Sequence, residues 1–147
     1  MNNHPIKGSH NWDIGFLDSG TTFSYLPHDM WDSLMFHFDY FCENAHKQPK
    51  VDGVNRYCAG KRFISTSDGE TVMCFKFDAK RFEGRHKEFL LGYPVLNFHI
   101  KLTNGGYHRI QWFPSEYLYL DRGGKKYCLA ADKANNNEIL FGSTLMR

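Results

Sequence analysis

Apolar and polar residues follow two different periods along this chain of 147 residues. An apolar run at 14–17 and a second at 23–26 flank a polar turn, and Pro27 ends the second run, so both runs are predicted to be strands. From Asp29 the spacing becomes helical, which predicts an amphipathic helix with Asp29 as its N-cap. The apolar stripe of this helix consists of Trp31, Leu34, Phe38 and Phe41.

Turn signals at hairpin spacing predict several short strands in the rest of the chain. Asp68-Gly69 separates 63–64 from 72–77, Asn104-Gly105-Gly106 separates 95–102 from 107–113, and Arg122-Gly123-Gly124 separates 117–120 from 126–131. A last strand is expected at 138–142. Six or more short strands with one clear helix predict a mostly β fold of antiparallel sheets, with the helix packed on a sheet.

Composition agrees with this fold and excludes two classes of partner. The chain has 13 Phe, 8 Tyr and 3 Trp, and large aromatic side chains favour strands. Its formal net charge of +2 gives no field strong enough to indicate a nucleic-acid partner, so the basic run at 76–87 is interpreted as a solvated loop. No apolar run approaches the roughly 18 residues of a membrane span.

The four cysteines, at positions 42, 58, 74 and 128, are not spaced as a zinc ribbon or a C-x-x-C redox motif. Two disulfides in an oxidising compartment are the first interpretation, and four buried free thiols are the alternative. Cys42 and Cys58 bracket a polar segment that a disulfide would close. The eight histidines form no H-x-x-x-H pair, so neither a metal nor another cofactor is expected.

The sharpest chemical feature is the turn Asp18-Ser19-Gly20-Thr21-Thr22, which directly follows an apolar run. Such a turn can hold an ionised aspartate through hydrogen bonds to its oxygens while one face of the carboxylate stays open. The tripeptide Asp-Ser-Gly is also common in ordinary turns, so it indicates catalysis only together with the rest of the chain.

Over most of its length the chain resembles the C-terminal lobe of pepsin-like (family A1) aspartic proteases, closest in style to plant and protist members. Four pieces carry the resemblance in the family's order: the loop 17–23 with Tyr25-Leu26-Pro27 and a helix behind it, the cysteines 74 and 128, the segment 93–100 with Tyr117-Leu118 behind it, and the segment 139–147. The segment 93–100 is similar to the family's Pro-x-apolar-x-Phe strand. The segment 139–147 is similar to the apolar-apolar-Gly strand that crosses beneath the catalytic loop.

The resemblance implies a role for each residue of this motif. Asp18 would be one of two catalytic aspartates, which share a proton and activate a water for attack on a peptide bond. Ser19 would brace the two active-site loops, and Thr21 would hydrogen-bond the carboxylate. Gly20, Thr21 and Thr22 would contact a peptide substrate in extended conformation. Structural roles are implied for a disulfide between Cys74 and Cys128, for an extra pair of Cys42 and Cys58, and for Gly142 beneath the loop.

The implied activity is that of an aspartic endopeptidase of the secretory pathway, whether secreted, vacuolar or lysosomal. No second D-[ST]-G occurs in the chain. Residues 1–147 are therefore expected to form a C-terminal lobe without the N-terminal lobe and the final strands, and the second aspartate would come from that lobe or from a homodimer. The alternative is a non-catalytic module for binding and interaction, since a single aspartate cannot form the dyad.

Overall fold

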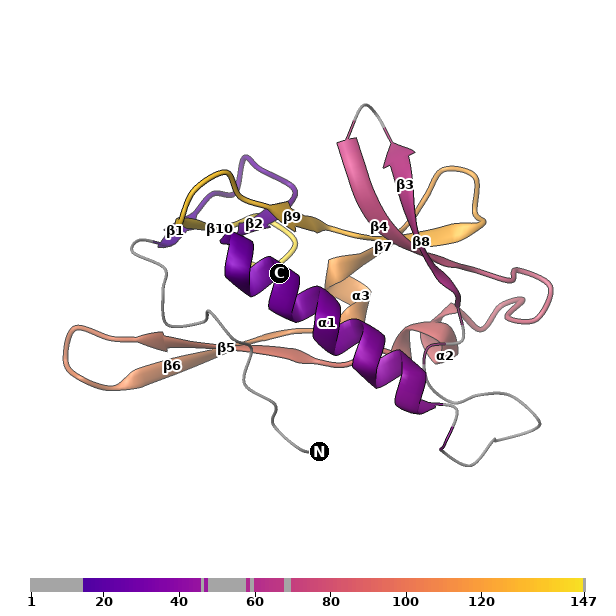
Figure 1. The fold of residues 1–147 in the computed structure, drawn as a ribbon, viewed down its shortest axis with the longest axis horizontal. Helices are drawn as coiled ribbons and strands as arrows, with labels where there is room; N and C mark the ends of the chain where they lie inside the picture. The colour runs from indigo at the N-terminus through magenta and orange to yellow at the C-terminus, as the bar shows by residue number, and fades with distance from the viewer. Residues whose placement is uncertain (1–14, 46, 48–57, 59, 68–69, 147) are drawn as a thin grey trace.

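The computed structural model describes residues 15–45, 47, 58, 60–67 and 70–146, and it is mostly β with antiparallel sheets and a few helices (Figure 1). The described elements in chain order are β1 (Gly15–Leu17), β2 (Ser24–Leu26), α1 (His28–Ala45), β3 (Arg62–Ser67), β4 (Glu70–Lys76), α2 (His86–Leu91), β5 (Leu96–Lys101), β6 (Tyr107–Trp112), α3 (Pro114–Tyr117), β7 (Leu118–Leu120), β8 (Lys126–Leu129), β9 (Ala131–Lys133) and β10 (Ile139–Phe141). The mostly β fold class is thus confirmed.

The strands form two four-stranded sheets and one hairpin. The first sheet has the order β1-β10-β2-β9, the second has the order β3-β4-β8-β7, and β5 pairs with β6. The second sheet and the hairpin are antiparallel, as expected. The first sheet is mixed, because β1 runs parallel to β10 and β2 parallel to β9. This parallel pairing was not predicted, since it joins segments that lie far apart in the sequence.

Helix α1 supplies the central part of the core. Met30, Leu34 and Phe38 are buried at successive four-residue intervals, which is the spacing of one helix face. The Phe38 ring lies 6.0 Å from the rings of both Phe75 and Tyr117, so the helix packs against strand β4 and the end of α3. In Figure 1 the helix runs from the first sheet toward α2.

Two details of this helix differ from the prediction. Trp31 and Phe41 are only partly buried, and Met30 takes the place of Trp31 in the buried stripe. The helix also begins at His28, so Asp29 lies in its first turn and is not the N-cap. A negative charge in the first turn still suits the positive end of the helix dipole.

Other boundaries also differ from those expected. The short helices α2 and α3 were missed, because each is at most six residues long. Such a segment is too short for apolar residues to repeat at helical spacing. The strand expected at 126–131 is divided at Ala130, whose N–H donates to the Tyr117 carbonyl while its carbonyl accepts from Ser24 N–H. At this point the chain passes from the second sheet to the first.

Both cysteine pairs form disulfides, which supports that interpretation over four free thiols. Cys42 bonds to Cys58 with their Cα atoms 5.3 Å apart, and Cys74 bonds to Cys128 with their Cα atoms 4.0 Å apart. Cys74 and Cys128 are direct partners in the β4–β8 register. Among the described residues, no helix is long and apolar enough to cross a membrane.

Candidate functional site

Asp18 lies at the end of β1, where the chain leaves the edge of the first sheet. Leu17 is the register partner of Phe141, and the Asp18 backbone N–H donates to the Phe141 carbonyl over 3.0 Å. The position of the aspartate is therefore fixed by a strand from the other end of the described chain. Its side chain is half-buried, while the neighbouring Ser19 and Gly20 are exposed.

The turn holds the Asp18 carboxylate through both of its oxygens. The Thr21 hydroxyl donates to Oδ2 over 2.6 Å, and the Gly20 backbone N–H donates to Oδ1 over 2.9 Å. These two hydrogen bonds favour the ionised form and lower the pKa of Asp18 below its ordinary value of 3.8, against a smaller opposing effect of desolvation. The side chain is thus a carboxylate at neutral pH, and it stays partly exposed within the turn.

The segment after β10 crosses directly beneath this turn, at Gly142. A Cβ atom at this position would lie 2.2 Å from the Phe23 carbonyl oxygen and 2.7 Å from that of Thr22, so only glycine fits between the two segments. The Gly142 N–H donates to the Ser24 hydroxyl over 3.0 Å, and the Ser143 N–H donates to the Thr21 carbonyl over 2.7 Å. The Asp18 turn therefore rests on a close, hydrogen-bonded contact with the C-terminal segment.

Three further polar groups support the site and were missed by sequence reasoning. Ser24 is fully buried and holds Gly142, as described above. The Thr144 hydroxyl donates to the Thr22 carbonyl over 3.2 Å, and the Thr144 carbonyl accepts from Trp112 Nε1 over 3.1 Å. The only signal in the sequence was a serine inside an apolar strand. The contacts of Trp112 and Thr144 had no local signal.

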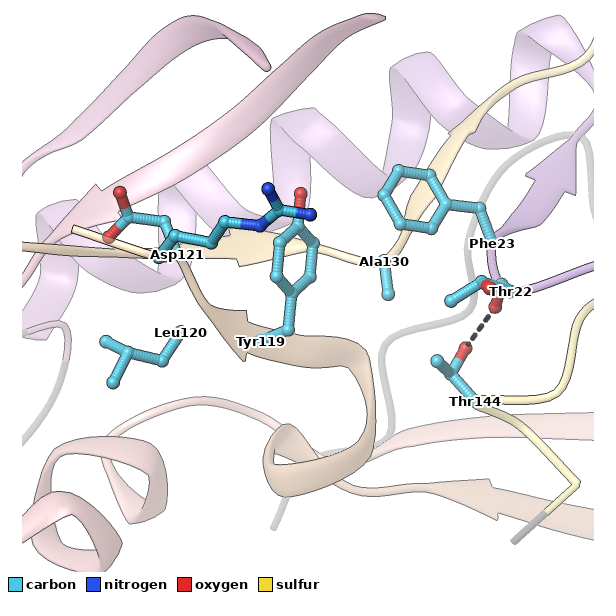
Figure 2. A pocket seen from close by; sticks show the side chains of 8 residues that line it. Thr22, Phe23, Tyr119, Leu120, Asp121, Ala130 and Thr144 are labelled. Carbon is cyan, nitrogen blue, oxygen red and sulfur yellow. Dashed lines mark hydrogen bonds between the residues drawn. The ribbon is translucent and has the colours of Figure 1, made fainter. Parts of the chain in front are cut away.

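A pocket of about 440 Å³ opens beside the Asp18 turn (Figure 2). It is lined by Thr22, Phe23, Tyr119, Leu120, Asp121, Arg122, Ala130 and Thr144. The rings of Phe23 and Tyr119 lie 5.7 Å apart and pack against Val72 and the Cys74–Cys128 disulfide. The predicted disulfide Cys74–Cys128 therefore lies behind a wall of this pocket.

The charged groups of the pocket come from the turn between β7 and β8. The Asp121 carboxylate accepts hydrogen bonds from the backbone N–H groups of Gly123, Lys125 and Lys126. Desolvation alone would raise the pKa of Asp121, but these hydrogen bonds and the Lys126 charge together lower it below 3.8. Asp121 is therefore ionised and is engaged by its own turn.

The predicted site residues are brought together in part. Asp18, Gly20, Thr21, Thr22 and Gly142 form one contiguous site, and Ser19 lies exposed within the same turn. The disulfide Cys42–Cys58 joins the C-terminal part of α1 to Cys58, whose N–H donates to the Gly92 carbonyl. This disulfide takes no part in the site. Within the described residues, no cluster of His, Cys, Asp or Glu could hold a metal ion.

No known family model matches the chain. The site is therefore interpreted from its own geometry.

Proposed function

We propose that the chain is the C-terminal lobe of a pepsin-like aspartic endopeptidase, in which Asp18 is one of two catalytic carboxylates. The observation that carries the proposal is the geometry of the Asp18 carboxylate. One oxygen is held by the Thr21 hydroxyl and the other by the Gly20 N–H. Beneath this turn the C-terminal segment passes so closely that only glycine fits at position 142. A fixed, partly exposed carboxylate is the group that general-base activation of a water requires.

In this mechanism a second carboxylate faces Asp18 and shares one proton with it, because two adjacent carboxylates do not both ionise at low cost. The ionised member takes a proton from a bound water, and this water attacks the carbonyl carbon of the substrate. The protonated member donates to the developing oxyanion. The hydrogen bonds from Thr21 and Gly20 stabilise the negative charge on Asp18 during the proton transfer.

The surface around Asp18 supports the presence of a facing lobe. Two apolar residues precede Asp18 on β1, which is an edge strand of the first sheet within the described residues. Both are exposed, Phe16 by 47% and Leu17 by 65%. Exposed apolar side chains on an open sheet edge favour pairing with another chain or lobe. A second lobe or a second copy at this edge would cover both side chains and bring its own carboxylate toward Asp18.

The turn also supports the binding of a peptide in extended conformation. Within the described part of the chain, the Gly20 carbonyl and the Thr22 N–H have no hydrogen-bond partner. Backbone groups of this kind bind an extended peptide in the way that a neighbouring strand would. The two disulfides support an oxidising compartment, so we propose that the enzyme works in the secretory pathway or after secretion.

Asp18→Asn tests the proposal in the assembly that supplies the second carboxylate, whether a paired lobe or a homodimer. We expect peptide hydrolysis at acid pH to fall by about 10³-fold or more, since the variant loses general-base catalysis. Asp78→Asn is the matched control, because Asp78 also accepts two backbone N–H groups in an exposed turn and lies outside the site. Normal turnover by Asp18→Asn would disprove the catalytic role. Peptide binding without hydrolysis in every assembly would favour the non-catalytic binding module.

A further inference from the structure

We infer that Arg122 makes the pocket beside the Asp18 turn selective for an acidic side chain of the bound peptide. This inference rests on the proposed function, because it takes the Asp18 turn as the place where the peptide lies. It adds what that function leaves open, which is the chemical class of peptide that the enzyme prefers.

The pocket begins directly beside the Asp18 turn. Thr22 lines the pocket, and the preceding residue Thr21 holds the Asp18 carboxylate. Consecutive Cα atoms are 3.8 Å apart, so the pocket begins one residue away from the contact that fixes the aspartate. An extended peptide advances about 3.3 Å per residue. A side chain only a few residues from the bond above Asp18 would therefore reach the pocket.

The pocket is lined largely by apolar side chains. Its apolar walls are Phe23, Tyr119, Leu120 and Ala130 (Figure 2). Ala130 is buried and small, and the Phe23 and Tyr119 rings rest on the Cys74–Cys128 disulfide. Apolar walls of this kind accommodate the methylene groups of a medium-sized side chain.

The turn beside the pocket carries a net positive charge. The turn 121–126 carries one acidic and three basic residues, so its formal charge is +2. The Asp121 carboxylate already accepts three backbone N–H groups of the turn. Arg122 lines the pocket and, among the described residues, its guanidinium has no hydrogen-bond or ion-pair partner. Because guanidinium pairs with carboxylate through two parallel hydrogen bonds, a substrate carboxylate is the group that this pocket complements.

Binding to matched peptides tests the inference without any need for hydrolysis. In a series of extended octapeptides, one glutamate is moved through each position, and each peptide is compared with its glutamine counterpart by fluorescence anisotropy at pH 7. We expect one position, or two neighbouring positions of the same strand face, to favour Glu over Gln by about threefold to tenfold, as for a partly exposed charge pair. Arg122→Gln should abolish the preference, and Arg122→Glu should favour lysine at the same position.

Lys125→Gln is the matched control, since it removes one positive charge from the same turn at a residue that does not line the pocket. It should keep most of the preference, and disulfide mapping of each variant verifies the fold. Equal binding of all Glu and Gln peptides, or an unchanged preference in Arg122→Gln, would overturn the inference even if Asp18→Asn abolishes hydrolysis. Conversely, a preference that depends on Arg122, combined with unchanged hydrolysis by Asp18→Asn, would disprove the catalytic role of Asp18 and leave Arg122 as part of a selective peptide-binding site.

Discussion

The Thr21 hydroxyl donates a 2.6 Å hydrogen bond to Oδ2 of Asp18, three residues before it in the same turn. The backbone closes the same turn, because the Thr21 N–H donates to the Asp18 carbonyl over 3.3 Å. Thr21 therefore contributes both to closing the turn and to the lowered pKa of its carboxylate. This coupling makes the acidity of Asp18 a direct measure of whether the turn is intact.

Thr21→Val should raise the pKa of Asp18 toward its ordinary value. The hydroxyl is the largest cause of the lowered pKa, and valine has nearly the same shape without a donor. The pKa is measured by NMR from the carboxyl carbon shift of Asp18 as a function of pH. Thr21→Ser is the control, and it should keep the pKa low. An equal pKa in Thr21→Val and the wild type would show that the hydroxyl does not stabilise the carboxylate.

The same pair predicts how stability changes with pH. Because the pKa of Asp18 is lower in the folded chain than the value of 3.8 for a free side chain, Asp18 stabilises the fold above about pH 4. This contribution is lost as the pH falls through the folded-state pKa. The difference in free energy of unfolding between the wild type and Thr21→Val should therefore narrow below about pH 4. Urea unfolding at several pH values measures this difference in free energy. A difference that widens on acidification would contradict the lowered pKa of Asp18 in the folded chain.

Gly142→Ala should disrupt the support beneath the Asp18 turn. The added Cβ would lie 2.2 Å from the Phe23 carbonyl oxygen, a backbone atom that cannot rotate away. We expect a loss of about 3 kcal/mol in the free energy of unfolding, at the upper end of overpacking effects, which corresponds to a fall of roughly 10 °C in Tm. Thermal unfolding followed by circular dichroism measures this loss.

Gly106→Ala provides the comparison for that experiment. A Cβ there would meet the Asn104 Oδ1 atom at 3.2 Å, which belongs to an exposed side chain that can move. Its effect should stay within about 0.5 kcal/mol. If Gly142→Ala and Gly106→Ala were equally stable, the inferred close contact between Gly142 and the Asp18 turn would be disproved.

Local signals in the sequence were sufficient to predict the pairing of the hairpin strands and the Asp18 turn. The predicted turn residues Asp68 and Gly69 themselves lie outside the described part of the chain. The turn at Asn104-Gly105-Gly106 is a clear case, since Gly105 has a φ of +84°, a conformation that favours glycine. The flanking strands β5 and β6 end within one residue of the predicted runs. The hydrogen bond from Thr21 to Asp18 also spans only three residues. Features of this kind depend on neighbours in the sequence.

Contacts between distant segments could not be predicted from local patterns. Gly142 N–H reaches the Ser24 hydroxyl across 118 residues, and Trp112 Nε1 reaches the Thr144 carbonyl across 32. The pocket is likewise lined by separate segments of the chain, at 22–23, 119–122, 130 and 144. Periodicity carries no information on such pairings, so the contacts that Ser24, Arg122 and Thr144 make could not be predicted from it.

The two disulfides should contribute unequally to stability. Cys74–Cys128 closes a sequence separation of 54 and Cys42–Cys58 one of 16. The loss of chain entropy in the unfolded state predicts about 4 kcal/mol for the first and about 3 kcal/mol for the second. The buried first pair also packs against Val72 and supports Phe23 and Tyr119 in the pocket wall, so its removal should have further effects there.

Paired alanine variants at each disulfide separate these contributions, with urea unfolding as the measurement. The variant without Cys74 and Cys128 should be the less stable and should also lose peptide binding, whereas the variant without Cys42 and Cys58 should keep it. Non-reducing peptide mapping of the unmodified chain establishes the bonds themselves. A link from Cys74 to Cys42 or Cys58 would contradict the β4–β8 register, because Cys74 and Cys128 are direct partners in it.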